Sequence, residues 1–472
     1  MSSIDTSGAE IASNGAARTN PLYFAAWRWH FYAGLYVVPF LMMLAITGFF
    51  MMLFTTHLPE YGDRIAIDPS GQLMTISEQN AAALAAVPGA TSVAEYTAPL
   101  TATTPALIDV VSGESTFVLA VNPYSGQILR QTVDGGTWYA FLEMIHGTLL
   151  IGWIGDRLIE IAASLGVLLL VTGLYLWWPR NGRGMSELLV PQLSAKGRAL
   201  WKSLHQVTGF WISIVLIFFL ISGLSWSGVW GEKFTQAWST FPAEKWDNVP
   251  LSDETHASMN HDGEKSVPWT LEQTPMPESG SFAGESVLPE GTAVNFDTLY
   301  VLGREIGLEG RFHLTAPASP DGVWTLNQNS MSYDGSSPMI DRTVHVDQYT
   351  GKVLADVRYA DYGVAGKAMA VGIALHEGQL GLLNFALNAA FCLSVLLVCV
   401  SGVIMWWKRR PAGASRLAAP PVPQNVPLAR GVVLIAVLLS MLFPMLGLTL
   451  LAVLAIDLAL LSAMPGVKRA VT

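Results

Sequence analysis

The sequence predicts a membrane protein: an all-α bundle of four core transmembrane helices in two duplicated halves, a C-terminal helical hairpin, and two α+β domains outside the bilayer. Three observations predict this fold class. Of the 472 residues, 51% are hydrophobic and 13% are charged, whereas soluble proteins carry about 25% charged residues. The apolar residues gather in long runs that polar stretches separate. The same short motifs recur, in the same order, in both halves of the chain.

Four apolar runs are long enough to span a hydrocarbon core of about 30 Å, which takes about 20 helical residues. They cover residues 30–54, 157–178, 205–230 and 383–407. A fifth run, 429–464, is too long for one span and is interrupted by Pro444 and Gly447. It predicts two short spans with a turn at this point, or one span plus a half-helix. Because residues 1–20 are polar and the first run has full spanning length, a signal anchor is favoured over a cleaved signal peptide.

The distribution of Lys and Arg predicts the orientation, because short basic loops stay on the cytoplasmic side. Segments 179–204 and 408–428 carry five and four basic residues, whereas segment 57–156 carries two basic and ten acidic residues. The N-terminus is therefore predicted to be cytoplasmic and both large domains periplasmic. The predicted organisation in chain order is a tail (1–29), the first helix (30–54), a first outer domain (57–145), an interfacial histidine segment with the second helix (146–178), a cytoplasmic loop (179–204), the third helix (205–230), a second outer domain with an insertion (231–375), a second histidine segment with the fourth helix (376–407), a cytoplasmic loop (408–428) and the terminal hairpin (429–464).

Charge and cysteine content exclude several classes of function. The net charge is −10 and no basic stripe is present, so nucleic-acid binding is not expected. Cys392 and Cys399 lie on one apolar run, about 10.5 Å apart along a helix axis, too far to form a disulfide with each other. Zinc fingers and cysteine-ligated clusters are excluded by the same count. The sequence has no C-x-x-C-H motif, so any haem is not of the covalently attached c type.

The duplication relates residues 30–178 to residues 205–407. Each unit begins with a histidine that is followed by glycines at the same two offsets, and each has a Tyr-x-Gly turn, a second histidine and a Trp-Trp end. The matching features are His30 with Gly34 and I-T-G (46–48), His205 with Gly209 and I-S-G (221–223), N-P-Y-S-G (122–126) and D-Q-Y-T-G (347–351), His146 and His376, and the ends T-G-L-Y-L-W-W (172–178) and S-G-V-I-M-W-W (401–407). Such a repeat predicts a pseudo-two-fold bundle in which equivalent residues face each other. The Tyr-x-Gly motifs predict surface hairpins with glycine in the turn.

Four histidines occupy equivalent places in the two units. His30 and His205 start the outward-going helices, and His146 and His376 lie just before the inward-going ones. A lone histidine at a membrane interface is usually structural, but two pairs related by a duplication predict facing imidazoles at each membrane face. Facing imidazoles form a bis-axial site for haem iron when each is neutral and bonded through one nitrogen. One haem at each face would carry electrons across a layer of about 30 Å.

Glycines near these histidines have two interpretations. Gly34 and Gly209, together with Gly48, Gly173, Gly223 and Gly402, would let a flat macrocycle approach the backbone. Close packing of helices through small residues explains the same glycines without any cofactor.

The remaining histidines are predicted to have no ligand role. His57 lacks a symmetric partner, because Glu232 stands at the equivalent position. His256 and His261 fall in segment 242–292, whose Pro, Ser, Glu and Gly content predicts a long loop or a partly disordered insertion. For His313 and His345, in the second outer domain, solvated side chains are expected.

The combination of motifs resembles the PepSY-associated transmembrane family, iron-regulated inner-membrane proteins that include siderophore–iron reductases. The resemblance covers about residues 23–465 and rests on His30-x3-Gly34, Leu204-His205-x3-Gly209, the two Tyr-x-Gly hairpins and the two Trp-Trp helix ends. It implies a bacterial inner-membrane protein with two periplasmic PepSY-like domains and b-type haem, two per chain. The implied activity is one-electron reduction of ferric iron in a periplasmic siderophore or another iron chelate, which releases Fe(II).

Two other functions are compatible with parts of the sequence. PepSY-like domains are associated with peptidase inhibition, so the outer domains would form a binding or regulatory module that the helices anchor in membrane lipid. Internal repeats also occur in transporters, although the helices carry few polar residues at mid-membrane, namely Thr47, Ser164, Ser213 and Ser394. The electron donor of a reductase stays unidentified, because the sequence has no nucleotide or flavin motif.

Overall fold

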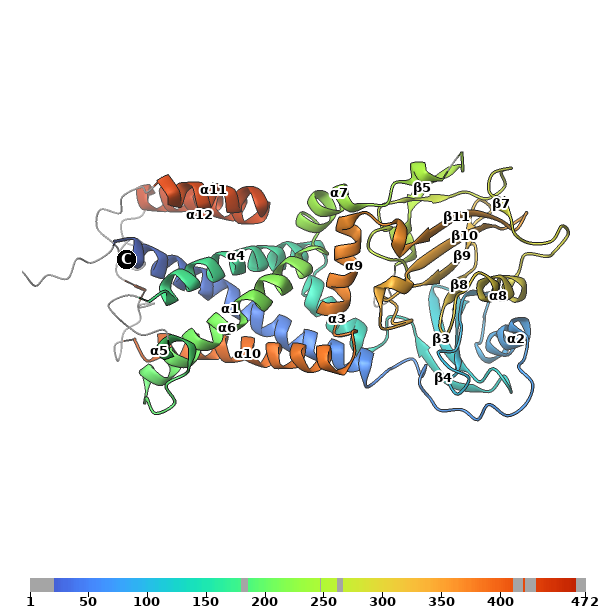
Figure 1. Cartoon of the computed structure of the whole chain (residues 1–472), viewed down its shortest axis with the longest axis horizontal. Helices are drawn as coiled ribbons and strands as arrows, with labels where there is room; N and C mark the ends of the chain where they lie inside the picture. Colours follow the sequence, from blue (N-terminus) through green and yellow to red (C-terminus); the bar gives the residue numbers. More distant parts are fainter. Residues whose placement is uncertain are drawn as a thin grey trace, which may run out of the picture. The chain divides into compact units, whose positions relative to one another are not determined.

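Figure 1 shows the computed structural model, which describes residues 21–179, 186–246, 248–260, 266–410, 419–420 and 430–463. Its two compact units interleave along the chain. Unit 1 falls within Met1–Val38, Ser164–Ser213 and Val400–Thr472, and unit 2 is formed by Pro39–Ala163 and Ile214–Cys399. The predicted N-terminal tail up to residue 20, the C-terminal residues from 464 and parts of both predicted cytoplasmic loops lie outside the described residues.

Within the described part of the chain, four helices are long and apolar enough to cross a membrane, as predicted. They are α1 (Pro21–Thr56), α4 (Trp153–Trp177), α6 (Arg198–Leu224) and α10 (Leu382–Trp407). Helix α1 begins nine residues before the predicted start at His30, and Pro21 suits this position because the first turn of a helix has no use for its missing N–H.

The third apolar run departs from its predicted length of 205–230. Helix α6 ends at Leu224, and a π-helical turn follows at Trp230–Gln236. The cause is a competing acceptor on α4: Glu160 accepts hydrogen bonds from the backbone N–H groups of Val229 at 3.2 Å and Trp230 at 3.0 Å. Arg157 donates to the same carboxylate at 2.7 Å, so this acid beside an apolar segment is fully engaged in holding the chain turn.

The fifth apolar run forms two helices, α11 (Arg430–Leu442) and α12 (Pro444–Ala463). They lie side by side, and the chain turns between them at Phe443 (Figure 1). A Cβ atom on Gly447 would lie 3.0 Å from the Cβ of Ser440, so glycine is needed where the second helix folds back on the first.

Two short helices outside the spans each carry a histidine in their last turn. Helix α3 (Trp138–Thr148) carries His146, and helix α9 (Val364–His376) ends at His376. Helix α3 starts where the Glu60 carboxylate accepts from the backbone N–H groups of Trp138 and Tyr139 at 3.0 and 2.8 Å. Each short helix thus delivers its histidine immediately before a spanning helix, α4 or α10, begins.

The strands of both predicted outer domains form one nine-stranded antiparallel sheet in unit 2. The order is β4 (Ile128–Val133), β3 (Ser115–Val121), β2 (Ala106–Ser112), β1 (Ser92–Thr97), β8 (His313–Thr315), β9 (Val323–Gln328), β10 (Arg342–Asp347), β11 (Lys352–Arg358) and β7 (Glu285–Ser286). The two predicted outer domains thus share one sheet: strand β1 of the first pairs with β8 of the second, with Tyr96 opposite Leu314. Joining the two sheets removes an exposed edge from each.

The repeated Tyr-x-Gly motifs form the two hairpins that were predicted. Gly126 (φ +67°) turns the chain from β3 to β4, and Gly351 (φ +68°) turns it from β10 to β11. Glycine adopts this left-handed conformation without the steric penalty of other residues.

One face of the sheet is covered by helices α2 (Ile76–Ala86) and α8 (Phe296–Glu305), as Figure 1 shows. Large apolar side chains from both predicted domains fill the layer between them, including Tyr96, Ile108, Leu299, Phe312 and Leu326. Since this core is shared, the two parts of the sheet stabilise each other.

Segment 242–292 is mostly irregular where the structure describes it, as the predicted loop implies, but it also forms short strands. It contributes β5 (Leu251–Thr255), β6 (Pro275–Pro277) and β7. Leu271 and Trp246 are buried in a cluster with Val357 of β11. A few apolar residues in an otherwise polar stretch provide enough burial to fix it on the sheet.

Candidate functional site

His30 on α1 and His205 on α6 face each other in unit 1. Their ring centroids are 6.3 Å apart and their planes meet at 88°. A metal–imidazole bond is about 2 Å long and the ring centroid lies about 1 Å behind the nitrogen, so two imidazoles on opposite sides of one metal ion have centroids about 6 Å apart. The sequence predicted that these two histidines face each other. Their spacing fits two imidazoles on opposite sides of one iron.

His146 and His376 line one cavity of about 860 Å³ in unit 2. The rings of Phe219 and Trp226 lie 4.5 and 6.2 Å from the ring of His376, centroid to centroid. Burial, together with the nearby His146, lowers the pKa of His376 to about 3. The imidazole is therefore neutral, which is the form that ligates a metal.

Every one of the four histidines places its Nδ1 against the hydroxyl of a serine or threonine on a spanning helix. The pairs are His30 with Thr172 at 3.0 Å, His146 with Thr47 at 2.8 Å, His205 with Ser401 at 3.2 Å and His376 with Ser222 at 2.7 Å. The four hydroxyls are those of the I-T-G, T-G, I-S-G and S-G motifs. These hydroxyls are visible in the sequence, but there Thr47 is only a mildly polar residue at mid-membrane, and nothing local links it to a histidine.

The hydrogen-bond partners assign the tautomer. Thr47 donates its only hydroxyl hydrogen to the carbonyl of Met43 at 2.9 Å, so towards His146 it accepts. Thr172 and Ser222 likewise donate to the carbonyls four residues earlier in their helices. In addition, Nδ1 of His30 lies 3.1 Å from the carbonyl oxygen of Leu169, which accepts only. The Leu169 carbonyl therefore places the proton on Nδ1 of His30, and the donation of Thr47 and Ser222 to their helix carbonyls favours the same tautomer, with the lone pair on Nε2, in His146 and His376.

The glycine after each hydroxyl makes room for the imidazole. A Cβ atom would lie 3.1 Å from Cε1 of His30 at Gly173 and 3.3 Å from Cε1 of His146 at Gly48. The distances are 3.4 Å at Gly402, beside His205, and 3.7 Å at Gly223, beside His376. We call each hydroxyl and its glycine an imidazole seat: Thr47–Gly48, Thr172–Gly173, Ser222–Gly223 and Ser401–Gly402.

The two other predicted cofactor glycines make no such contact. A Cβ atom at Gly34 would lie 3.9 Å from a methyl group of Leu169, and at Gly209 it would meet nothing within 4 Å. Open space at these positions is compatible with the approach of a macrocycle, whereas the four seat glycines lie against the histidine side chains instead.

The contacts between histidines and seat hydroxyls lie within each predicted repeat, whereas the histidine pairs join the two repeats. Each histidine bonds to a hydroxyl on another helix of its own repeat. His30 and His146 bond to hydroxyls on α4 and α1, and His205 and His376 bond to hydroxyls on α10 and α6. The facing partners come from opposite repeats. Each repeat thus orients its own imidazoles, and a ligand bound by a pair bridges the two.

The donor set suits a haem better than a bare metal ion. Among the described residues, no three His, Cys, Asp or Glu side chains converge as they would around a metal ion. A haem iron needs only two protein ligands, because the porphyrin supplies the others. The cavity beside His146 and His376 is mostly lined by apolar helix residues and is within the size range of cofactor sites, about 300–1,000 Å³.

Residues 27–409 match the family described as the PepSY-associated TM region. The chain belongs to this family. No curated protein matches the chain. Membership shows a membrane protein of the PepSY-associated class, in agreement with its four apolar helices.

In this PepSY-associated protein the cavity also has polar lining residues. Arg64, Tyr139, Glu143, Tyr333 and Glu377 line it. Tyr333 lies in the left-handed region (φ +58°), which is strained for a residue with a bulky side chain, and its hydroxyl donates to Glu377 at 3.2 Å. The loop between β9 and β10 is thereby fixed next to the helix end that carries His376.

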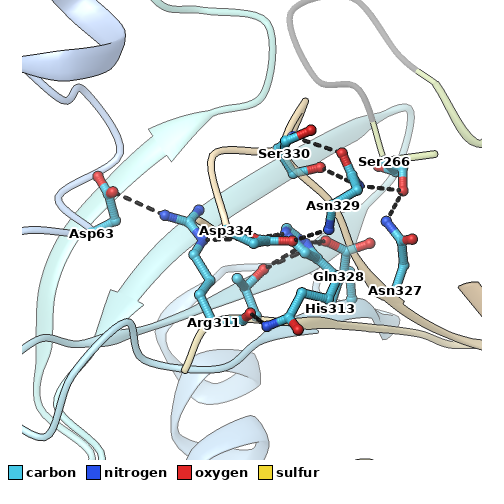
Figure 2. A network of polar contacts seen from close by, with 12 residues as sticks. Asp63, Ser266, Arg311, His313, Asn327, Gln328, Asn329, Ser330 and Asp334 are labelled. Carbon is cyan, nitrogen blue, oxygen red and sulfur yellow. Dashed lines mark hydrogen bonds and ion pairs between the residues drawn. The ribbon is translucent and has the colours of Figure 1, made fainter. Parts of the chain in front are cut away.

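His313 is buried on the sheet, which corrects the expectation of a solvated side chain. Its Nδ1 contacts Glu95 at 2.5 Å and its Nε2 contacts Asp334 at 2.9 Å. Figure 2 shows Arg311 beside Asp334, with Asp63 at the far end of the guanidinium. Burial alone would lower the pKa of His313, but Asp334 and Glu95 outweigh burial and raise it well above its usual value. The ring is an imidazolium between two carboxylates.

His256 and His345 are also fully buried, not solvated or in a flexible insertion, and they bond to each other through Nε2 at 2.8 Å. His256 donates from Nδ1 to the carbonyl of Thr274 at 2.6 Å, so His345 donates across the pair and accepts from Thr325 at 3.0 Å. Burial lowers the pKa of His256 to about 4. Both rings are neutral and both use all their nitrogens.

Two histidines remain, His57 and His261. His57 is exposed and its ring lies 4.5 Å from that of Phe385, centroid to centroid. His261 lies outside the described residues.

Proposed function

We propose that this chain is a b-type di-haem reductase of the bacterial inner membrane that passes electrons across the bilayer to a periplasmic ferric chelate. The chelate is a ferric siderophore or a compound of the same chemistry, and Fe(II) is the product. The observation that carries the proposal is the pairing of imidazole rings, since the ring centroids of His30 and His205 lie 6.3 Å apart.

Haem supplies one-electron redox chemistry when it is bound. The residues of the chain would hold and orient it: His30 with His205 at one site, His146 with His376 at the other. Because Nδ1 is committed to a seat hydroxyl in His30, His146 and His376, Nε2 is the nitrogen that ligates. The apolar helix residues around the cavity exclude water from the second site.

We assign the acceptor to the side of the sheet, where the cavity opens from apolar helix residues to polar groups such as Tyr139 and Tyr333. The distribution of basic loop residues supports a periplasmic position for this side, with the N-terminus in the cytoplasm. Reduction is an effective way to release iron, because hard oxygen ligands hold Fe(III) much more tightly than the softer Fe(II).

The test is a set of single alanine variants of the four paired histidines, with His57→Ala as the matched control. The protein is purified in detergent, its haem is counted per chain, and reduction of a ferric trihydroxamate is followed by trapping Fe(II). His146→Ala and His376→Ala should each lose one haem and slow the reduction at least tenfold, whereas His57→Ala should match the wild type. Full haem content and full rate in the His376→Ala variant would contradict the proposal.

A further inference from the structure

Three of the four seat hydroxyls, those of Thr47, Thr172 and Ser222, each make two hydrogen bonds of different kinds, whereas Ser401 contacts His205. Thr47, Thr172 and Ser222 donate along their own helix and accept from an imidazole of another helix. All four, Ser401 included, are at most 5% exposed. The helix carbonyl satisfies the hydroxyl hydrogen in any case, so the serine or threonine does not depend on the imidazole. The Nδ1–H group, buried in a bundle, does depend on an acceptor.

We propose that Thr47, Thr172, Ser222 and Ser401 are positioning residues that hold each imidazole in its Nδ1-protonated tautomer and set its strength as an axial ligand. The inference rests on the proposed function, since it concerns how the histidines present Nε2 to haem. A hydrogen bond from Nδ1–H increases the electron donation of the ring to a metal and fixes the ring plane.

The structure ranks the four positions. His30 has two acceptors for Nδ1–H, the hydroxyl of Thr172 and the carbonyl of Leu169. Among the described residues, the ring nitrogens of His146 and His376 each have one partner, the hydroxyls of Thr47 and Ser222. Removing the Thr172 hydroxyl leaves His30 an acceptor, whereas removing the Thr47 or Ser222 hydroxyl leaves none. A purely structural role of these hydroxyls in their helices would give no such ranking.

The experiment compares Thr47→Val, Ser222→Ala and Thr172→Val in the haem-loaded, full-length protein. Valine keeps the shape of threonine and removes only the hydroxyl. Thr47→Ser and Ser222→Thr restore the hydroxyl, and Ser394→Ala is the matched control, because Ser394 makes the same bond to a helix carbonyl, Ala390 at 2.8 Å, without contacting a histidine. The readouts are haem retained during dialysis against apomyoglobin, the midpoint potential of each haem, and the electron paramagnetic resonance spectrum of the ferric protein.

Thr47→Val and Ser222→Ala should weaken haem retention at the His146–His376 site about 10–100-fold. They should also raise its midpoint potential, by about 59 mV for each tenfold change in the one-electron equilibrium constant, because a ring that donates fewer electrons stabilises ferric iron less. Thr172→Val should shift the His30–His205 site less, and the Ser and Thr rescue variants and Ser394→Ala should match the wild type.

Two outcomes separate this inference from the proposed function. A wild-type protein without haem would overturn the proposed function itself. A wild-type protein with two haems whose Thr47→Val and Ser222→Ala variants keep the wild-type potentials, spectra and retention would overturn only the positioning role.

Discussion

Buried histidines serve two regions of this protein, and the two regions use the imidazole ring differently. On the sheet, His256, His313 and His345 are at most 1% exposed, and both ring nitrogens of each have a protein partner. In the helical region, His30 and His376 engage Nδ1 alone within the described part of the chain.

The difference separates histidines that hold the fold from histidines that present a ligand. A ring with both nitrogens bonded is a structural cross-link, charged between acids in the case of His313 and neutral in the case of His256. A ring fixed through Nδ1 alone, close to an equivalent ring or beside a cavity, is compatible with metal ligation through Nε2.

The largest expected effect separates the regions by stability. His313→Ala leaves Glu95 and Asp334 buried without the imidazolium between them. Breaking a buried ion pair from one side costs about 3–5 kcal/mol, so the sheet should unfold at a markedly lower denaturant concentration. His376→Ala should leave sheet stability unchanged and remove haem instead. Hydrogen exchange of β8 and β9 in both variants checks this. Equal stability of the two variants would erase the distinction.

A smaller effect sharpens the comparison within the helical region. Alanine at Gly173 would press on Cε1 of His30 at 3.1 Å, closer than normal packing tolerates, whereas alanine at Gly223 would meet Cε1 of His376 at an ordinary 3.7 Å. Gly173→Ala should therefore displace the ring and lower haem content at the His30–His205 site. Gly223→Ala should retain haem at the other site. The absorption spectrum per chain measures both, and a reversed order would show that these glycines serve helix packing instead.

The smallest expected effect concerns pH and the sheet region alone. The pKa of His256 is about 4 in the folded protein, against about 6.5 in an unfolded chain. Because the folded pKa is the lower one, this stabilisation is complete above pH 6.5 and is lost as the pH falls towards 4. His256→Asn should flatten the loss of stability between pH 6.5 and 4 by about 1.4 kcal/mol per pH unit. Hydrogen exchange of β10 at several pH values measures the slope, and an unchanged slope would contradict the assignment.

The sequence predicts much of the helical region, because its signals are local. Apolar runs mark the four spanning helices, and Gly126 and Gly351 mark the two hairpins. The spacing of His30 and His205 from their glycines identified a pair that does meet. The hydroxyls before the seat glycines were visible as well, but only the structure shows that they face the histidines.

The sheet region was predicted less well, because its determinants are distant in sequence. His313 bonds to Glu95, which lies 218 residues earlier in the chain, and no local sequence pattern indicates a buried charge with such a distant partner. Pairing of β1 with β8 joins strands of the two predicted domains and depends on edges that periodicity does not identify. The insertion was interpreted from its polar composition, whereas a few residues such as Leu271 decide its packing.

The most direct measurement is the haem content and reduced-minus-oxidised visible spectrum of the detergent-purified, full-length protein from cells supplied with haem. Two b-type haems per chain are expected, one for each histidine pair. A single haem would contradict the equivalence of the two pairs, and a protein without haem would contradict the ligand role of all four histidines.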